Sequence, residues 1–304
     1  RCPEFKERLK EAIEVENVVY QSDLQAREAI VEKLKRVNNI DVPPDQVMLT
    51  QGVIPGMWLA ARHACRPGDE VIVTDPMYFP FFICTEVIQT DPVYWKLKLD
   101  GSYKFDTERL KELITPKTRL IYVCNPHNPA GRAMTKEELN GVADVAVDHG
   151  IYVMVDELWE DIRYDDIDHY TLASLNDEIA DLTVTSWGFS KTWNIPGLQA
   201  GYLSCTNPVM FKSIQKIGTG ILRGTNNLGK AIAPLICGGE IDYWVEDMNA
   251  YLTKIRDLTT KRLTEMGDIT VPKLEATYLM FPKFNYGLNC YELNKILMED
   301  AKVS

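Results

Sequence analysis

Short apolar runs recur along the chain and alternate with segments whose apolar residues repeat at helical intervals. Five runs predict buried parallel strands: Val71–Thr74, Leu120–Cys124, Ile151–Val155, Leu182–Thr185 and Ala200–Leu203. Strands of this kind are apolar on both faces because helices cover both sides of the sheet. The alternation of strand and helix signals therefore predicts an α/β fold with a mainly parallel sheet and right-handed crossovers.

The clearest helix signal begins at Thr135. Thr135 and Glu138 have the spacing of a capping box, and apolar residues follow at helical intervals as far as His149-Gly150. A second helical stretch covers residues 226–266, where Pro234 and Gly238-Gly239 should break or kink the helix. We interpret the part after that break as a long helix that leaves the large domain.

The chain is long enough for two domains, since one domain takes roughly 100–200 residues. Residues 16–250 are predicted to form the large domain. Residues 1–15 and 251–304 are predicted to pack together as a smaller α/β domain that is incomplete at both ends. Within it, Ala276–Phe284 should be a strand and Cys290–Asp300 a helix.

The net charge, the lengths of the apolar runs and the cysteines limit which partners and compartments are expected. The formal net charge is −11, and nucleic acid binding needs a basic face, so a nucleic-acid partner is not expected. No uncharged apolar run approaches the roughly 20 residues that span a bilayer, so a membrane span is not expected either. The seven cysteines include no C-x-x-C pair, and this odd, scattered set favours a reduced, cytoplasmic protein.

Ligands of open α/β sheets bind at the carboxyl ends of the strands, so polar residues there are functional candidates. Thr50–Gly56 precedes a helical segment, and its glycines and the free N–H groups of that helix could cradle a phosphate. Asp75–Tyr78 places an aromatic ring where it could stack on a flat cofactor. A plain loop and a packed core tyrosine are the alternatives for these two segments.

Cys124–Arg132 contains two Asn-Pro pairs and a glycine, which impose a specific turn. An asparagine of this turn could donate its amide to an oxygen on a ligand ring. His127 lies between the two pairs, but no second histidine stands at ligand spacing. We therefore expect no metal site.

Asp156-Glu157 follows a buried strand directly, and a carboxylate in that position is costly unless it is paired. Its partner could be a cationic ligand atom, or the residue could cap a helix or pair with a lysine or arginine. Lys191 also follows a buried strand and lies among aromatic and small residues. A partly desolvated lysine is a nucleophile suited to a Schiff base with an aldehyde, whereas most lysines are solvated surface residues.

These segments, in this order, resemble the fold-type I enzymes that depend on pyridoxal 5′-phosphate (PLP), within the class I/II aminotransferase family. The resemblance covers nearly the whole chain. The turn Asn125–Arg132, the segment Ser190–Gln199 and the spacing from Asp156 through His169 to Lys191 are similar to the cystathionine β-lyase-like branch.

The resemblance implies roles for individual residues. Lys191 would form the Schiff base with PLP and then move the Cα proton, and Asp156 would keep the pyridine nitrogen protonated. Asn128 would donate to the ring oxygen and Tyr78 would stack on the ring. The expected phosphate ligands are the backbone at Gly52, Val53 and Ile54 and the hydroxyls of Ser186 or Ser190. Tyr20 stands where the family has a tyrosine that reaches the partner subunit's phosphate, which implies a homodimer with shared sites.

Two positions depart from the family pattern. Trp159 stands where aminotransferases have tyrosine and the lyase branch has histidine, and its indole can donate only one hydrogen bond to the cofactor. Gln199 stands where many aminotransferases have an arginine. The arginine that binds the substrate carboxylate is expected beyond Ser304.

We therefore expect an enzyme that transfers the amino group of an amino acid. A C–S β-lyase that releases thiol, pyruvate and ammonia is the first alternative, since both reactions use the same lysine and cofactor. A non-catalytic protein with this fold is the second, although such a protein need not retain Lys191, Asp156 and Asn128 together.

Overall fold

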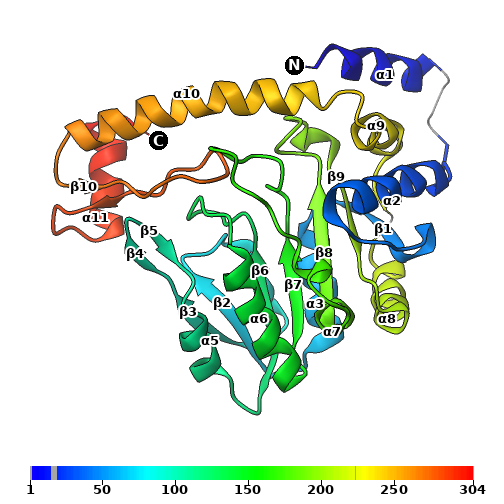
Figure 1. Ribbon diagram of the computed structural model, residues 1–304, viewed down its shortest axis with the longest axis horizontal. Coiled ribbons are helices and arrows are strands. Elements are labelled where there is room, and N and C mark those ends of the chain that lie inside the picture. Colours follow the sequence, from blue (N-terminus) through cyan, green and yellow to red (C-terminus); the bar gives the residue numbers. More distant parts are fainter. Residues whose placement is uncertain (1, 15–18, 223, 304) are drawn as a thin grey trace.

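The described residues of the computed structural model, 2–14, 19–222 and 224–303, contain one central sheet of seven strands (Figure 1). From one edge to the other, the strands are β1 (Val47–Gln51), β9 (Ala200–Ser204), β8 (Thr183–Gly188), β7 (Tyr152–Asp156), β6 (Thr118–Cys124), β2 (Glu70–Asp75) and β3 (Asp91–Lys96). Strands β8, β7, β6 and β2 run parallel, as predicted, and β3 continues the parallel part of the sheet.

The strand at Ala200–Leu203 exists, but the prediction that it runs parallel is wrong. Strand β9 lies antiparallel to both β8 and β1. A parallel connection needs a crossover of a dozen or more residues, usually a helix, and the segment between Gly188 and Ala200 holds only turns and the 3-10 helix Pro196–Leu198. The chain therefore turns back beside β8. Strands β1 and β3 were not predicted.

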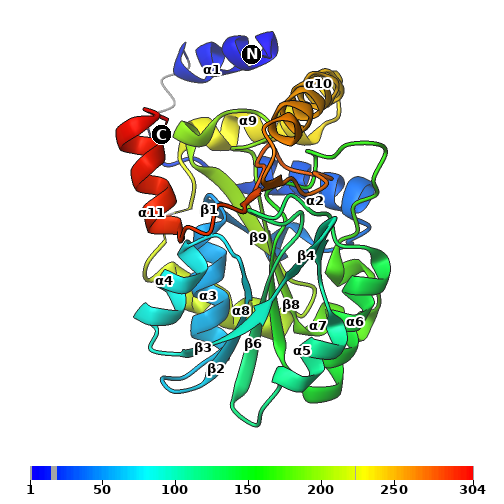
Figure 2. The same cartoon turned by 90° about the vertical axis from the view of Figure 1, so that its left-hand side faces the viewer.

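Helices cover both faces of the sheet (Figure 2). On one face lie α3 (Ile54–Ala64), α4 (Pro80–Val87) and α8 (Pro208–Thr219). On the other face lie α2 (Leu24–Asn38), α5 (Thr107–Leu113), α6 (Lys136–His149), α7 (Asp177–Leu182) and α9 (Asn227–Cys237). Both faces of strands β6 and β7 are buried, which explains their unbroken apolar sequences.

The helix predicted from Thr135 is confirmed as α6, and both bonds of its capping box are present. The Glu138 N–H donates to the Thr135 hydroxyl at 3.2 Å, and the Thr135 N–H donates to Glu138 Oε2 at 2.9 Å. Gly150 ends the helix with a positive φ of 62°.

The break in residues 226–266 occurs at the glycines and not at Pro234. Pro234 lies inside α9, which continues to Cys237, and Gly239 then takes a φ of 88° that favours glycine. The next helix, α10 (Tyr243–Glu265), is the long helix that we expected. It lies along the top of the molecule in Figure 1, and it runs through the predicted domain boundary at residue 250.

The prediction of a strand over Ala276–Phe284 is largely wrong. Ala276 makes one bridge to Arg163, and only Lys283–Phe284 (β11) pairs, with Ile269–Thr270 (β10). Between them Thr277 adopts a φ of 65°, which interrupts extended backbone. The helix expected at Cys290–Asp300 is present as α11 (Cys290–Lys295), followed by a π-helical turn, Ile296–Asp300. A second two-stranded sheet joins β4 (Lys98–Asp100) and β5 (Ser102–Lys104).

The first helix, α1 (Pro3–Glu14), does not pack where we expected. Arg8 donates to the Ala231 carbonyl of α9, Phe5 lies edge-on to Trp193, and Glu4 accepts from Tyr243 at the start of α10. The contacts of α1 are thus with α9 and its surroundings and not with residues 251–304. The division into residues 16–250 and the remainder stays a prediction. No helix among the described residues is long and apolar enough to cross a membrane.

Candidate functional site

A pocket of about 150 Å³ lies where the carboxyl ends of several strands meet. It is lined by Gln51, Gly52, Val53, Ile54, Tyr78, Asn128, Asp156, Leu158, Trp159, Ser190 and Lys191. Gln51 and Asp156 end β1 and β7, and the other residues come from the segments that follow β1, β2, β6, β7 and β8. The expectation that Lys191, Asp156, Asn128 and Tyr78 converge on one cleft is met.

The wall formed by residues 51–54 depends on two glycines. Gly52 has a φ of 80°, which favours glycine. Gly201 of β9 packs directly against it, and a Cβ atom at residue 201 would lie 2.8 Å from the Gly52 backbone. Val53 then caps α3 without a side-chain hydrogen bond. Pro55 has no N–H and the Gly56 N–H donates to the Val53 carbonyl, so the backbone N–H groups of Val53 and Ile54 are the candidate anion donors at this end of the helix. This end of α3 can therefore bind an anion.

Asp156 is the last residue of β7, and its side chain is buried. Its Oδ1 accepts from the Leu158 N–H at 3.0 Å, and no ion pair to it is present among the described residues. Burial raises the pKa of Asp156 to about 7, with Glu157 adding to the rise, while the Leu158 N–H and Lys191 oppose it. The carboxylate thus lacks the cationic partner that its burial calls for, and the protonated nitrogen of a pyridine ring would supply one.

Lys191 faces the indole of Trp159. Its Nζ lies 5.4 Å from the centre of the Trp159 ring, within the range of a cation–π contact. Trp159 is almost fully buried and packs edge-on to Tyr278, with ring centres 4.6 Å apart. Its indole N–H makes no hydrogen bond to another described residue, so it remains available to a ligand in the pocket.

Two of the predicted residues lie away from the pocket lining. Ser186 is buried in β8, its hydroxyl has no partner in the described chain, and it faces Gly56, where a Cβ atom would lie 1.8 Å from its Oγ. Tyr20 is 99% exposed. Ser190, by contrast, lines the pocket. Gln199 ends the 3-10 helix Pro196–Leu198 with a φ of 45°, and its carbonyl accepts from Thr225.

Directly behind the pocket lies a buried polar network that the sequence did not reveal. Glu157 Oε2 accepts from Trp187 Nε1 and Thr171 Oγ1, both at 2.9 Å. The carboxylate of Glu160 accepts from Lys33 and from Asn38. Acidic residues at 157 and 160, shortly after a buried strand, were the signal that the sequence offered. It could not show that Glu160 pairs with Lys33 and Asn38 of α2, or that Glu157 accepts from Thr171 and Trp187.

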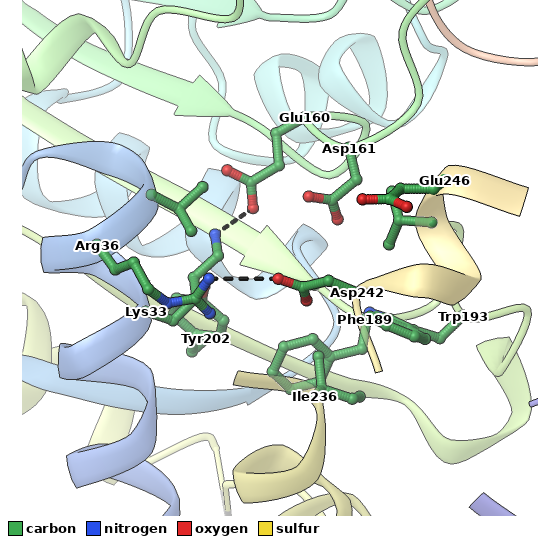
Figure 3. A pocket seen from close by; sticks show the side chains of 13 residues that line it. Lys33, Arg36, Glu160, Asp161, Phe189, Trp193, Tyr202, Ile236, Asp242 and Glu246 are labelled. Carbon is green, nitrogen blue, oxygen red and sulfur yellow. Dashed lines mark hydrogen bonds and ion pairs between the residues drawn. The ribbon is translucent and has the colours of Figure 1, made fainter. Parts of the chain in front are cut away.

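Atoms of Glu157, Glu160 and His169 lie within 4.8 Å of one another, as in metal sites. Both oxygens of Glu160 accept from donors of the chain. His169 Nε2 lies 3.3 Å from Glu157 Oε2, but Glu157 Oε1 and both ring nitrogens of His169 make no hydrogen bond to another described residue. Figure 3 shows Lys33 reaching Glu160, and Arg36 reaching Asp242 at 3.3 Å, across a second cavity of about 240 Å³. That cavity contains none of the residues predicted for the cofactor.

Comparison with known proteins places this geometry in a family. Residues 3–303 match the family described as aminotransferase class I and II. The chain is 30% identical to aromatic-amino-acid aminotransferase 2 of Thermococcus litoralis, over 98% of this chain and 78% of that protein. It is 31% identical to cystathionine beta-lyase PatB of Bacillus subtilis, over 100% of this chain and 80% of the relative. The PLP-bound putative aminotransferase from Clostridium difficile 630 superposes with a TM-score of 0.93 at 30% identity, covering 100% of this chain and 79% of that one.

Fold and site together define a PLP-dependent enzyme of fold type I, because its structural neighbours bind PLP and its pocket supplies donors that fit PLP. Within that class, the chain belongs to the aminotransferase class I and II family, since the match runs over nearly the entire chain. The alternative of a non-catalytic protein with this fold is set aside.

The burial of the Asp156 carboxylate should make the stability of the PLP-free protein depend on pH. Burial holds the pKa of Asp156 near 7 in the folded state, against about 3.9 when unfolded, so the fold loses stability as the pH rises from about 4 through 7. Asp156→Asn keeps the acceptor for the Leu158 N–H and removes the charge. At pH 8, we expect PLP-free Asp156→Asn to unfold several °C above PLP-free wild type, since each kcal/mol of stability raises the unfolding temperature by about 2–4 °C. Near pH 4, the two proteins should unfold at the same temperature.

Asp45, an acid in the exposed turn before β1, provides the control Asp45→Asn, which should leave the pH dependence unchanged. An Asp156→Asn protein that is less stable than wild type at pH 8 would show that the carboxylate already has a cationic partner.

Proposed function

We propose that this enzyme is an amino-acid aminotransferase that also has measurable C–S β-lyase activity. One observation carries the proposal: Lys191, Asp156, Asn128 and Tyr78 line a single pocket at the strand ends. The aminotransferases among its relatives support the first activity, and cystathionine beta-lyase PatB supports the second.

When bound, PLP supplies an aldehyde that condenses with amines and a protonated ring that withdraws electrons from the substrate Cα. Lys191 would supply the amine that holds that aldehyde, and the same amine would move the Cα proton of the substrate. Asp156 keeps the ring nitrogen protonated. Tyr78 stacks on the ring, and Asn128 and the free indole N–H of Trp159 donate to the ring oxygen.

The phosphate group would be held by the N–H groups at the start of α3, with the hydroxyl of Ser190. The hydroxyl of Ser186 could bind the phosphate only after moving away from Gly56, since Ser186 lies outside the pocket lining. Gly52 keeps this wall open because a side chain there would be strained.

We propose further that the enzyme is a homodimer whose sites are shared. The segment that carries Tyr20 is anchored to α9, because Lys230 donates to the Gln21 carbonyl at 2.9 Å and pairs with Asp23. The fixed backbone holds the Tyr20 side chain outward, where a second subunit could use it. An apolar groove of about 450 Å³, which includes Ile54 and Trp58, adjoins the cofactor pocket and could be covered by that subunit.

A cytoplasmic location is also a proposal. Six of the seven cysteines are buried as free thiols, and a reducing compartment keeps thiols in that state.

Replacing the proposed nucleophile should abolish catalysis. Lys191→Ala should lose the visible absorbance of PLP-reconstituted enzyme and nearly all turnover, since no other amine of the described chain lines the pocket. Absorbance spectra and keto-acid assays measure both effects, with Lys212→Ala on the exposed face of α8 as the control. Wild-type turnover by Lys191→Ala would disprove the assignment.

Transamination and β-elimination can be separated by their products. We expect amino-group transfer from an amino acid to an added keto acid. With cystathionine and no keto acid, we expect slower release of thiol and pyruvate, because the thiolate leaves from Cβ once the Cα proton is gone. Transamination without such release would refute the lyase activity. Release without any amino transfer would make the β-lyase, and not the aminotransferase, the main activity.

Shared sites can be tested by mixing two defective variants. Tyr20→Phe lacks the hydroxyl offered to the partner, and Lys191→Ala lacks the nucleophile. In a mixed dimer, one site would combine the intact Lys191 of one subunit with the intact Tyr20 of the other, so activity should rise above that of either variant. Sedimentation as an active monomer, or no recovery in dimers shown to be mixed, would contradict the proposal.

A further inference from the structure

One buried histidine links the two segments that carry Tyr78 and Asn128. His127 is fully buried, and its Nε2 lies 2.8 Å from the hydroxyl oxygen of Thr74. Thr74 is in β2, four residues before Tyr78, and His127 directly precedes Asn128. The turn around His127 is tight, since its N–H donates to the Arg132 carbonyl and its own carbonyl accepts from Gly131.

The surrounding hydrogen bonds fix which nitrogen carries the proton. His127 Nδ1 is 3.3 Å from the Ala130 N–H, which can only donate, so Nδ1 is an unprotonated acceptor. Nε2 therefore carries the hydrogen and donates it to Thr74. The Thr74 hydroxyl in turn donates to Met77 Sδ at 3.0 Å. One directed chain of hydrogen bonds thus runs from Ala130 through His127 and Thr74 to Met77, the neighbour of Tyr78.

The imidazole ring of His127 does not act as an acid or a base in this position. Burial, with Arg132 nearby, lowers the pKa of His127 to about 3, so the imidazole is neutral at any working pH. Phe105 lies edge-on to the ring, with ring centres 5.4 Å apart, and closes it off from solvent. Both nitrogens are engaged, and neither faces the pocket lining. What remains is a mechanical role.

We propose that His127 is a positioning residue that holds Asn128 and Tyr78 in register through its bond to Thr74. The inference rests on the proposed function, in which Asn128 donates to the cofactor's ring oxygen and Tyr78 stacks on the same ring. The two residues follow the neighbouring strands β6 and β2, whose backbone pairing ends at Ile121 and Ile72, before the loops begin. The His127–Thr74 bond fixes their separation beyond that point.

The link can be cut from either side without enlarging a cavity much. His127→Asn keeps an acceptor near the Ala130 N–H but is too short to reach Thr74, whereas His127→Gln can still donate to Thr74. Thr74→Val removes the hydroxyl and keeps the shape. Thr183→Val is the matched control, since Thr183 is equally buried and bonds the Ile179 carbonyl at 2.7 Å, at the opposite end of the sheet.

We expect His127→Asn and Thr74→Val each to weaken the binding of PLP by about threefold to tenfold, the value of one hydrogen bond, and to shift the visible absorbance of the bound cofactor. The double variant should be no worse than either single variant, because both remove the same bond. His127→Gln should restore most of the affinity, and Thr183→Val should not change it.

Pyridoxal, which lacks the phosphate, provides a second readout. Its affinity should fall by the same factor as that of PLP, because the ring contacts and not the phosphate contacts are disturbed. Thermal unfolding of each PLP-free variant separates lost positioning from lost folding.

Additive losses in the double variant, or wild-type affinity in His127→Asn, would overturn the role of His127. Neither result would touch the proposed function, whose own failure would appear as wild-type protein that does not bind PLP through Lys191.

Discussion

The buried carboxylate of Asp156 is the constraint on which the rest of the site depends. A charged group at the end of an apolar strand is unfavourable, and burial has already raised its pKa to about 7. No lysine or arginine among the described residues pairs with it. A cation at this point would relieve the cost of burial, and in the proposed function the protonated ring nitrogen of PLP would be that cation. Binding of the cofactor then stabilises the strand end that holds it.

The sheet brings the other groups to Asp156. Strands β2, β6, β7 and β8 run parallel, so the segments that follow them meet at one edge. Strand β9 runs the other way, and the chain must turn back after β8 within a short segment that carries Lys191. Gly201 of β9 packs closely against Gly52, and Lys191 lines the same pocket as residues 51–54.

Sequence reasoning found the residues whose role follows from their place on a strand. Asp156, Asn128 and Tyr78 were predicted because polar residues at strand ends face the ligand edge, and Lys191 because the ordered motifs resemble a family. It failed where the outcome depends on what meets in three dimensions. The packing of α1 and the pairing of Lys33 with Glu160 involve partners far away in sequence, and the direction of β9 depends on how the short segment after β8 turns back. The strand expected at 276–284 failed locally, because Thr277 adopts a left-handed conformation that its residue type does not suggest.

Trp159 bears on how the enzyme chooses between its two reactions. Its indole can donate a hydrogen bond but cannot accept or release a proton in catalysis. Asp156 is committed to the ring nitrogen, and burial raises the pKa of Tyr78, which keeps that phenol protonated. Of the described residues that line the pocket, Lys191 is thus the one group suited to move the Cα proton. If Lys191 is the single base, the choice between returning that proton and expelling a group from Cβ depends on the substrate's leaving group, and the proposed pair of activities would then need one site alone.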